Sequence, residues 1–212
     1  MFRDRIEAGK ILAQAIKEKG WSLFRKDSII LALPRGGIIV AAEVAKALDL
    51  PLDIIVTRKI GAPLNPEYAL AAVGENALVL NPNEVIDEKY IEAESKKERA
   101  EIKRRLEEYR GKKEKPELSK KKVILIDDGL ATGLTMEVAI QEVKTFNPQK
   151  IILAVPVAPP ETAEKLSSLV NAQIILKIEP IFFAIGQFYQ NFPQVSDEEV
   201  KDILNSFGFE AK

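Results

Sequence analysis

The sequence predicts an α/β fold in which a mostly parallel sheet is flanked by helices. Short apolar runs alternate with longer amphipathic or charged stretches, which is the pattern of βαβ units. Some runs, such as 123–126, are apolar at every position, as in strands covered on both faces. The 212 residues, of which 46% are hydrophobic and 30% charged, suffice for one globular core. We therefore expect residues 1–212 to form a single domain.

The individual elements follow from local patterns. Apolar residues recur at helical spacing over 2–19, and Gly20 is a suitable helix stop. Ser196 or Asp197 is expected to cap the last helix. Strands are predicted at 28–33, 52–56, 69–73, 77–80, 123–126, 151–155 and 172–178. Helices are predicted at 2–19, 38–48, 83–110, 135–146, 162–170 and 196–207. Stretches rich in Gly, Pro or Asn predict an irregular loop and a rigid turn at 57–67 and 156–160.

Composition excludes several classes of function. The chain has no Cys and no His, which excludes disulfides, thiolate chemistry, a Ser-His-Asp triad and His-ligated zinc. A net charge of −1 gives no general attraction to nucleic acid. No apolar run approaches the roughly 20 residues that span a bilayer, and the charged N-terminus lacks a signal-peptide core. These features predict a cytoplasmic protein with no nucleic-acid or membrane partner.

The most informative stretch is 123–136, where an apolar strand ends at Asp127 and Asp128. Ligands of open α/β sheets lie beyond the carboxyl ends of the strands, and paired carboxylates suit vicinal hydroxyls or a hydroxyl-bound cation. Gly133 can adopt a positive φ, and the helix that begins near Thr135 directs its positive end toward an anion. The loop is built of small and hydroxyl residues, Ala131, Thr132, Gly133, Leu134 and Thr135. A strand-to-turn segment with a helix cap is the alternative, but the complete string favours a ribose 5-phosphate site.

A second loop follows the strand predicted at 28–33. Gly36 and Gly37 permit close approach of the backbone to an anion, and Arg35 can bind that anion in a bidentate manner. The alternative is an ordinary strand-to-helix turn. The position of the loop, at the carboxyl end of a neighbouring strand, favours a binding function.

A third segment, 57–68, begins with two cations. Arg58 and Lys59 could neutralise a leaving anion, and the loop after them could close over the site and exclude water. The alternative is a solvated loop with ordinary surface charges.

Two longer segments have less specific patterns. The segment 178–195 contains Phe182, Phe183, Phe188 and Tyr189, whose rings could stack on a planar base. A hydrophobic cap or a subunit interface is the alternative. The segment 84–122 mixes both charge signs around a narrow apolar stripe, which favours a solvated helix leaning on the body, with a homodimer contact as the alternative.

The complete segment 123–136 is similar to the phosphoribosyl diphosphate (PRPP) signature of type I phosphoribosyltransferases. The segment 33–37 resembles the pyrophosphate loop of that family, and Arg58 and Lys59 resemble the start of its flexible catalytic loop. Nearly the whole chain resembles a subgroup with a long helical insertion. The resemblance implies a Rossmann-like sheet, an insertion at 84–122, a C-terminal hood and a cis peptide at Pro34–Arg35 or Arg35–Gly36.

The resemblance also implies a reaction. It is the transfer of 5-phosphoribosyl from PRPP to a nitrogen acceptor, expected to be a nucleobase-like compound, with Mg²⁺ as cofactor and pyrophosphate as leaving group. Asp127 and Asp128 would hold the ribose hydroxyls or the waters of the metal, and Arg35 and Lys59, supported by Arg58, would stabilise pyrophosphate.

The nature of the acceptor and the activity itself stay open. Ala131 stands where hypoxanthine-guanine enzymes commonly carry an Asp, which disfavours a 6-oxopurine acceptor. The main alternative is a PRPP-sensing regulator without transferase activity. A phosphatase or hydrolase acting on a phosphorylated sugar is a third interpretation, for which the sequence offers no obvious nucleophile.

Overall fold

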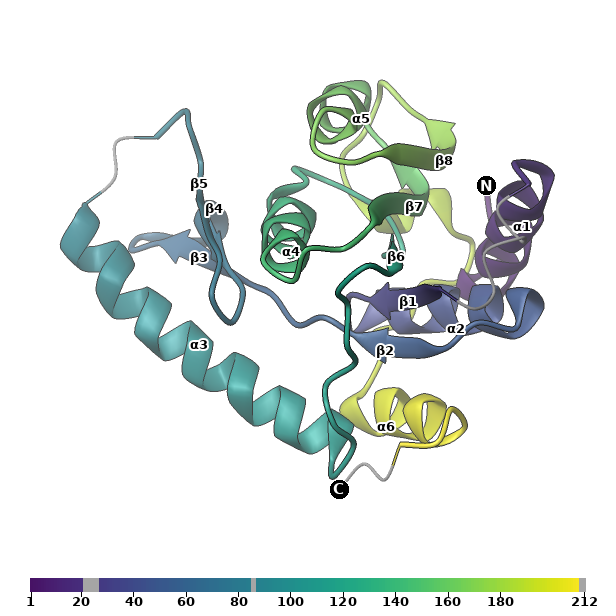
Figure 1. Cartoon of the computed structure of the whole chain (residues 1–212). Helices are drawn as coiled ribbons and strands as arrows, with labels where there is room; N and C mark the ends of the chain where they lie inside the picture. Colours follow the sequence, from purple (N-terminus) through teal and green to yellow (C-terminus); the bar gives the residue numbers. More distant parts are fainter. Residues whose placement is uncertain (21–26, 85–86, 210–212) are drawn as a thin grey trace.

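The computed structural model describes residues 1–20, 27–84 and 87–209, and its main body is a five-stranded parallel sheet (Figure 1). The strand order is β2-β1-β6-β7-β8. The strands are β1 (Ser28–Ala32), β2 (Leu52–Ile54), β6 (Lys122–Ile126), β7 (Lys150–Ala158) and β8 (Ala172–Ile178). This arrangement confirms the α/β class and the parallel sheet.

Helices cover both faces of the main sheet (Figure 1). On one face lie α1 (Arg5–Glu18), α2 (Gly36–Leu48) and α6 (Asp197–Asn205), and on the other lie α4 (Leu134–Lys144) and α5 (Pro160–Ser167). Alternate residues of the central strand β6 enter the two cores, with Ile124 and Ile126 on one side and Val123 and Leu125 on the other. Within the described ranges, no helix has the length and apolar composition to cross a bilayer.

A small antiparallel sheet lies beside the main sheet (Figure 1). It consists of β3 (Arg58–Ala62), β4 (Asn65–Val73) and β5 (Leu78–Leu80). The pairing of β4 with β5 confirms the predicted strand partners, whereas the predicted irregular loop at 57–67 is wrong. Its Gly and Pro residues signal breaks in regular structure, but register shifts between Ile60 and Ala62 accommodate them within a β3–β4 hairpin.

The turn between β4 and β5 is held from two helices. Glu142 of α4 accepts hydrogen bonds from the Asn76 backbone N (2.8 Å), the Asn76 Nδ2 (2.7 Å) and the Ala77 backbone N (2.7 Å). Arg99 of the insertion donates to the carbonyls of the same two residues, at 3.2 and 3.4 Å. The small sheet is therefore fixed relative to the helix that follows the Asp127–Asp128 string.

The predicted turn at 156–160 needs correction. Residues 156–158 continue strand β7, which pairs with β8 as far as Ala158, and Pro160 begins α5. A Pro usually ends a strand because it lacks an N–H, but Pro156 is accommodated between paired positions 155 and 157.

The insertion forms one long helix, α3 (Glu88–Arg110), which runs from the small sheet to α6 (Figure 1). Two of its predicted residues, 85–86, lie outside the described residues. Ile91, Ile102, Leu106 and Tyr109 are buried and belong to the main core. The end of the helix is anchored where Arg110 Nη2 donates to Asp53 Oδ1 at 2.8 Å. The insertion is therefore part of the packed body and is solvated on its outer side only.

Burial of α3 predicts a specific loss of stability. Ile102 is fully buried, so Ile102→Ala should lower the free energy of unfolding by about 2–5 kcal/mol. Lys103→Ala, one residue away on the exposed side, should change it by no more than about 0.5 kcal/mol. Urea unfolding followed by circular dichroism measures both variants. Equal stabilities would contradict the packing of α3 onto the core.

Candidate functional site

Two of the predicted site segments leave the same edge of the sheet. Strands β1 and β6 pair in parallel from Ser28 with Lys122 to Ala32 with Ile126. The segments 34–37 and 127–133 therefore begin side by side. A Cβ on Gly37 would lie 2.8 Å from the Asp127 Cα, so only glycine permits this approach. The Pro34–Arg35 peptide is cis, at one of the two bonds that the family resemblance implies.

The predicted phosphate loop is held by its neighbours. Gly133 has a φ of 74° and precedes the first residue of α4, which confirms the expected positive φ. The Ala131 carbonyl accepts a hydrogen bond from Thr162 Oγ1 at 2.6 Å, and the Leu130 N donates to the Val157 carbonyl at 2.9 Å. Thr162 belongs to α5, and the sequence gives no signal that it supports this loop.

The two adjacent carboxylates lie in different environments. Asp128 is buried, and its Oδ2 accepts a hydrogen bond from Arg5 Nε at 2.7 Å. Arg5 also donates through Nη1 to the Pro193 carbonyl at 2.8 Å and lies over the Phe192 ring, 3.7 Å from its centroid. The Tyr189 hydroxyl donates to the Asp128 carbonyl at 2.6 Å. Asp128 is thus engaged by the protein, and Arg5 has no motif that would reveal its role from sequence.

Asp127 is the more accessible member of the pair. Its side chain is partly buried at the end of β6, and Oδ1 accepts a hydrogen bond from the Asp128 N at 2.8 Å. Burial, followed by the negative charge of Asp128, raises the pKa of Asp127 well above its usual range. Burial also raises the pKa of Asp128, but Arg5 opposes that shift by direct contact. An additional cation would therefore stabilise the charged form of Asp127 more than that of Asp128, which already contacts Arg5.

The structure separates Arg58 and Lys59, which the sequence suggested would act together. Because both lie in strand β3, their side chains point to opposite faces. Arg58 Nε donates to Glu98 Oε2 of α3 at 2.7 Å. Lys59 lines a pocket of about 610 Å³ with Thr132 and Thr135 of the phosphate loop. The expectation that both cations start one mobile loop is therefore corrected.

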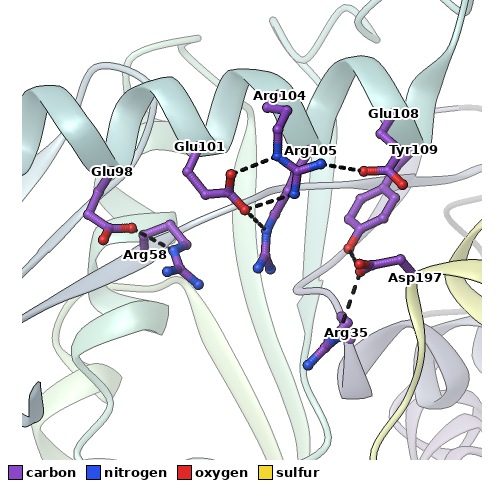
Figure 2. Close-up of polar contacts among 9 residues, drawn as sticks. All are labelled: Arg35, Arg58, Glu98, Glu101, Arg104, Arg105, Glu108, Tyr109 and Asp197. Atoms are coloured by element: carbon purple, nitrogen blue, oxygen red, sulfur yellow. Dashed lines mark hydrogen bonds and ion pairs between the residues drawn. The ribbon is translucent and has the colours of Figure 1, made fainter.

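Arg35 lies at the start of α2 and faces α6 and α3 (Figure 2). Its Nη1 is 3.8 Å from Asp197 Oδ1, and the same carboxylate oxygen accepts a hydrogen bond from the Tyr109 hydroxyl. Burial first, and then the hydrogen bond to Asp197, raise the pKa of Tyr109. Arg35 is thus held loosely at the sheet edge next to the glycine loop.

The aromatic segment is mainly a hydrophobic cap. Phe188 and Tyr189 are buried, and Phe2 and Phe192 lie against the Tyr189 ring with centroids 5.4 and 4.9 Å away. Phe182, which is partly buried, packs against Phe188. For Phe188 and Tyr189, burial favours the hydrophobic-cap alternative over stacking on an acceptor. Phe183, at 89% exposure, is the ring of this set that remains open.

The profile of the phosphoribosyl transferase domain matches residues 3–186. This chain belongs to the phosphoribosyl transferase family. The match confirms the family predicted from segments 33–37 and 123–136, and together with the sheet order it confirms the type I phosphoribosyltransferase fold.

Three similar proteins come from Thermus thermophilus, Mycobacterium tuberculosis and Pyrococcus horikoshii. The crystal structure of TT1426 from Thermus thermophilus is 41% identical, with a TM-score of 0.81, and the match covers 98% of this chain and 99% of that one. "Putative phosphoribosyl transferase Rv0571c" of Mycobacterium tuberculosis is 38% identical over 97% of this chain. The match covers 46% of that relative, so this chain spans about half its length. A purine phosphoribosyltransferase from Pyrococcus horikoshii is more distant, at 20% identity, a TM-score of 0.49 and coverage of 89% and 90%.

The buried contact between Arg5 and Asp128 gives a prediction for this phosphoribosyl transferase domain. Arg5→Met should lower the free energy of unfolding by about 3–5 kcal/mol, because it leaves a buried carboxylate without its cation. Asp128→Asn should also destabilise the protein, since Arg5 then loses its charged partner. In the double variant the losses should be clearly less than additive. Strict additivity in urea unfolding would contradict a direct energetic coupling of the two side chains.

Proposed function

We propose that this protein transfers the 5-phosphoribosyl group of PRPP to a nitrogen acceptor and releases pyrophosphate. The observation that supports this best is a pair of helix N-termini at adjacent strands. Helix α2 follows β1 and helix α4 follows β6, and neither N-terminus has a side-chain cap bonded to it. Uncapped N–H groups attract anions. Two such ends on either side of a carboxylate suit a sugar that carries a phosphate at one end and a pyrophosphate at the other.

Each end of the ligand is assigned to one group of residues. The amides that precede α4, with Thr132 and Thr135, would bind the 5-phosphate, and the shared pocket adds the Lys59 ammonium to this end. The amides of Gly36 and Gly37, with Arg35, would bind pyrophosphate. Lys59 is therefore proposed as a 5-phosphate ligand, in place of the pyrophosphate role suggested by its position beside Arg58.

The site suits Mg²⁺ held mainly by the substrate. Among residues 1–20, 27–84 and 87–209, no three His, Asp or Glu side chains cluster into a cation cage. Mg²⁺ is commonly bound through one or two carboxylates together with substrate phosphates and water. Asp127 fits that role, because its side chain is only partly buried and a nearby cation would stabilise its charged form. The ion would supply charge neutralisation of the pyrophosphate.

The protein residues favour bond cleavage by position and charge. As the bond to pyrophosphate breaks, positive charge develops on the sugar, and the Asp127 carboxylate stabilises it. Arg35 and the amides of the glycine loop stabilise the departing anion. A nitrogen nucleophile then attacks the anomeric carbon. The exposed ring of Phe183 is the aromatic surface left for an acceptor, and Ala131 provides no carboxylate to move a base proton.

The decisive assay offers the native protein PRPP, Mg²⁺ and a panel of nucleobases and other nitrogen compounds, and measures pyrophosphate and new nucleotide. Acceptor-dependent release of pyrophosphate supports the transferase. Saturable PRPP binding without turnover on any acceptor would instead support a PRPP-sensing regulator. Release of phosphate without an acceptor would support a hydrolase. The homodimer contact stays a prediction that this assay does not address.

The different environments of the two carboxylates predict different consequences of their loss. Asp127→Asn should weaken Mg·PRPP binding by about 10- to 100-fold, the usual value of a hydrogen bond to a charged group, with little change in unfolding. Glu107→Gln, on the exposed side of α3, removes the same charge and should leave affinity unchanged. Calorimetric titration measures both. Unaltered affinity of the Asp127 variant would refute its assignment to the ligand.

The assignment of Lys59 to the 5-phosphate end is tested with two compounds that each represent one part of PRPP. Lys59→Gln should weaken the binding of ribose 5-phosphate by about tenfold. It should change the affinity for inorganic pyrophosphate by no more than about twofold. Lys144→Gln, at the exposed end of α4, is the charge-matched control. If the Lys59 variant loses pyrophosphate affinity instead, Lys59 acts at the leaving group and the pocket assignment is wrong.

A further inference from the structure

One side of α3 faces Arg58 and Arg35, of which Arg35 is assigned to the pyrophosphate end of the proposed site (Figure 2). We call Glu98, Glu101, Arg105 and Tyr109 the inner stripe of α3. These positions are three or four residues apart and so lie on one side of the helix. Tyr109 is itself one of the buried residues that pack α3 onto the body, and the other three lie next to that buried side of the helix. The inner stripe is therefore held in a fixed position relative to the sheet.

Two residues of the inner stripe form contacts near the sheet edge, one with a cation and one with a carboxylate. Glu98 accepts from Arg58 Nε at 2.7 Å, and Tyr109 donates to Asp197, the carboxylate beside Arg35. Arg35 lies three residues after the end of β1 and Arg58 four residues after the end of β2, so both arginines lie near the carboxyl ends of adjacent strands. The inner stripe thus spans the interval between them.

Arg105 lies between these two contacts along the helix. Its side chain is only 20% exposed, and its Nε donates to Glu101 Oε1 at 2.7 Å. Arg105 lies about one helical turn before Tyr109, whose hydroxyl donates to the carboxylate beside Arg35. In Figure 2 the side chain of Arg105 extends from α3 toward the side on which Arg58 and Arg35 lie.

The carboxylate that holds Arg105 has a second cation. Glu101 Oε2 and Oε1 also accept hydrogen bonds from Arg104, at 2.7 and 2.9 Å. These hydrogen bonds from Arg104, and then from Arg105, lower the pKa of Glu101 to about 2. If Arg105 turned toward another anion, Glu101 would keep the Arg104 contacts. Glu101 would therefore still be paired with a cation after Arg105 had moved.

We propose that α3 forms part of the pyrophosphate site and that Arg105 binds the pyrophosphate of PRPP together with Arg35. This inference rests on the proposed transferase function. The Nε of Arg105 is engaged by Glu101, and its two Nη groups extend beyond that contact, in the fork that suits two phosphate oxygens. The insertion thereby supplies a cation at the leaving-group end, while Lys59 serves the opposite end.

The test titrates inorganic pyrophosphate with Mg²⁺, and separately ribose 5-phosphate, into the full-length protein by calorimetry. Arg105→Gln should weaken pyrophosphate binding by about tenfold. It should change the affinity for ribose 5-phosphate by no more than about twofold. Lys103→Gln removes the same charge from the opposite side of α3 and should change neither affinity. Arg105→Lys should recover only part of the loss, because it restores the charge without the fork.

Several results would overturn the inference. Unchanged pyrophosphate affinity of Arg105→Gln would remove Arg105 from the site while leaving the proposed function intact. Equal loss of affinity for both ligands would mean that Arg105 supports the fold and does not bind pyrophosphate. If the native protein binds neither PRPP nor either half, the proposed function fails as well.

Discussion

The buried ion pair between Arg5 and Asp128 holds the functional edge of the molecule together. It joins α1 to the end of β6, and the Arg5 contacts with Pro193 and Phe192 extend it to the C-terminal cap. There is no room for a side chain on Gly36 beside Asp128, so the glycine loop packs against the same point. One of the two signature acids therefore organises the site, which leaves the other, Asp127, as the acid best placed to meet a ligand.

The central fold and the meeting of the two loops at one sheet edge were predictable because their signals are local. An apolar run that ends in Asp127 and Asp128, and a glycine loop after the first strand, predict parallel strands whose carboxyl ends lie side by side. The different environments of Asp127 and Asp128 were not predictable. It depends on Arg5, which lies 123 positions away from Asp128 and carries no motif of its own.

The errors of sequence interpretation have physical causes. Gly61 and Pro66 suggested a loop, yet cross-strand pairing with register shifts formed a hairpin from the same residues. That change matters for chemistry, because alternation along β3 sends Arg58 toward α3 and Lys59 toward the phosphate loop. The narrow apolar stripe at 84–122 predicted a solvated helix that leans on the body, and the burial of Ile102 confirms this prediction. The sequence did not reveal that Glu98 of this helix binds Arg58.

The central claim is that the two loops after β1 and β6 hold the two ends of one PRPP molecule. A crystal structure of the protein with Mg²⁺ and PRPP tests it most directly. We predict the 5-phosphate at the amides of 131–135, the ribose beside Asp127, and the pyrophosphate at Gly36 and Gly37. A PRPP molecule bound in the reverse orientation, or away from Asp127, would contradict the account.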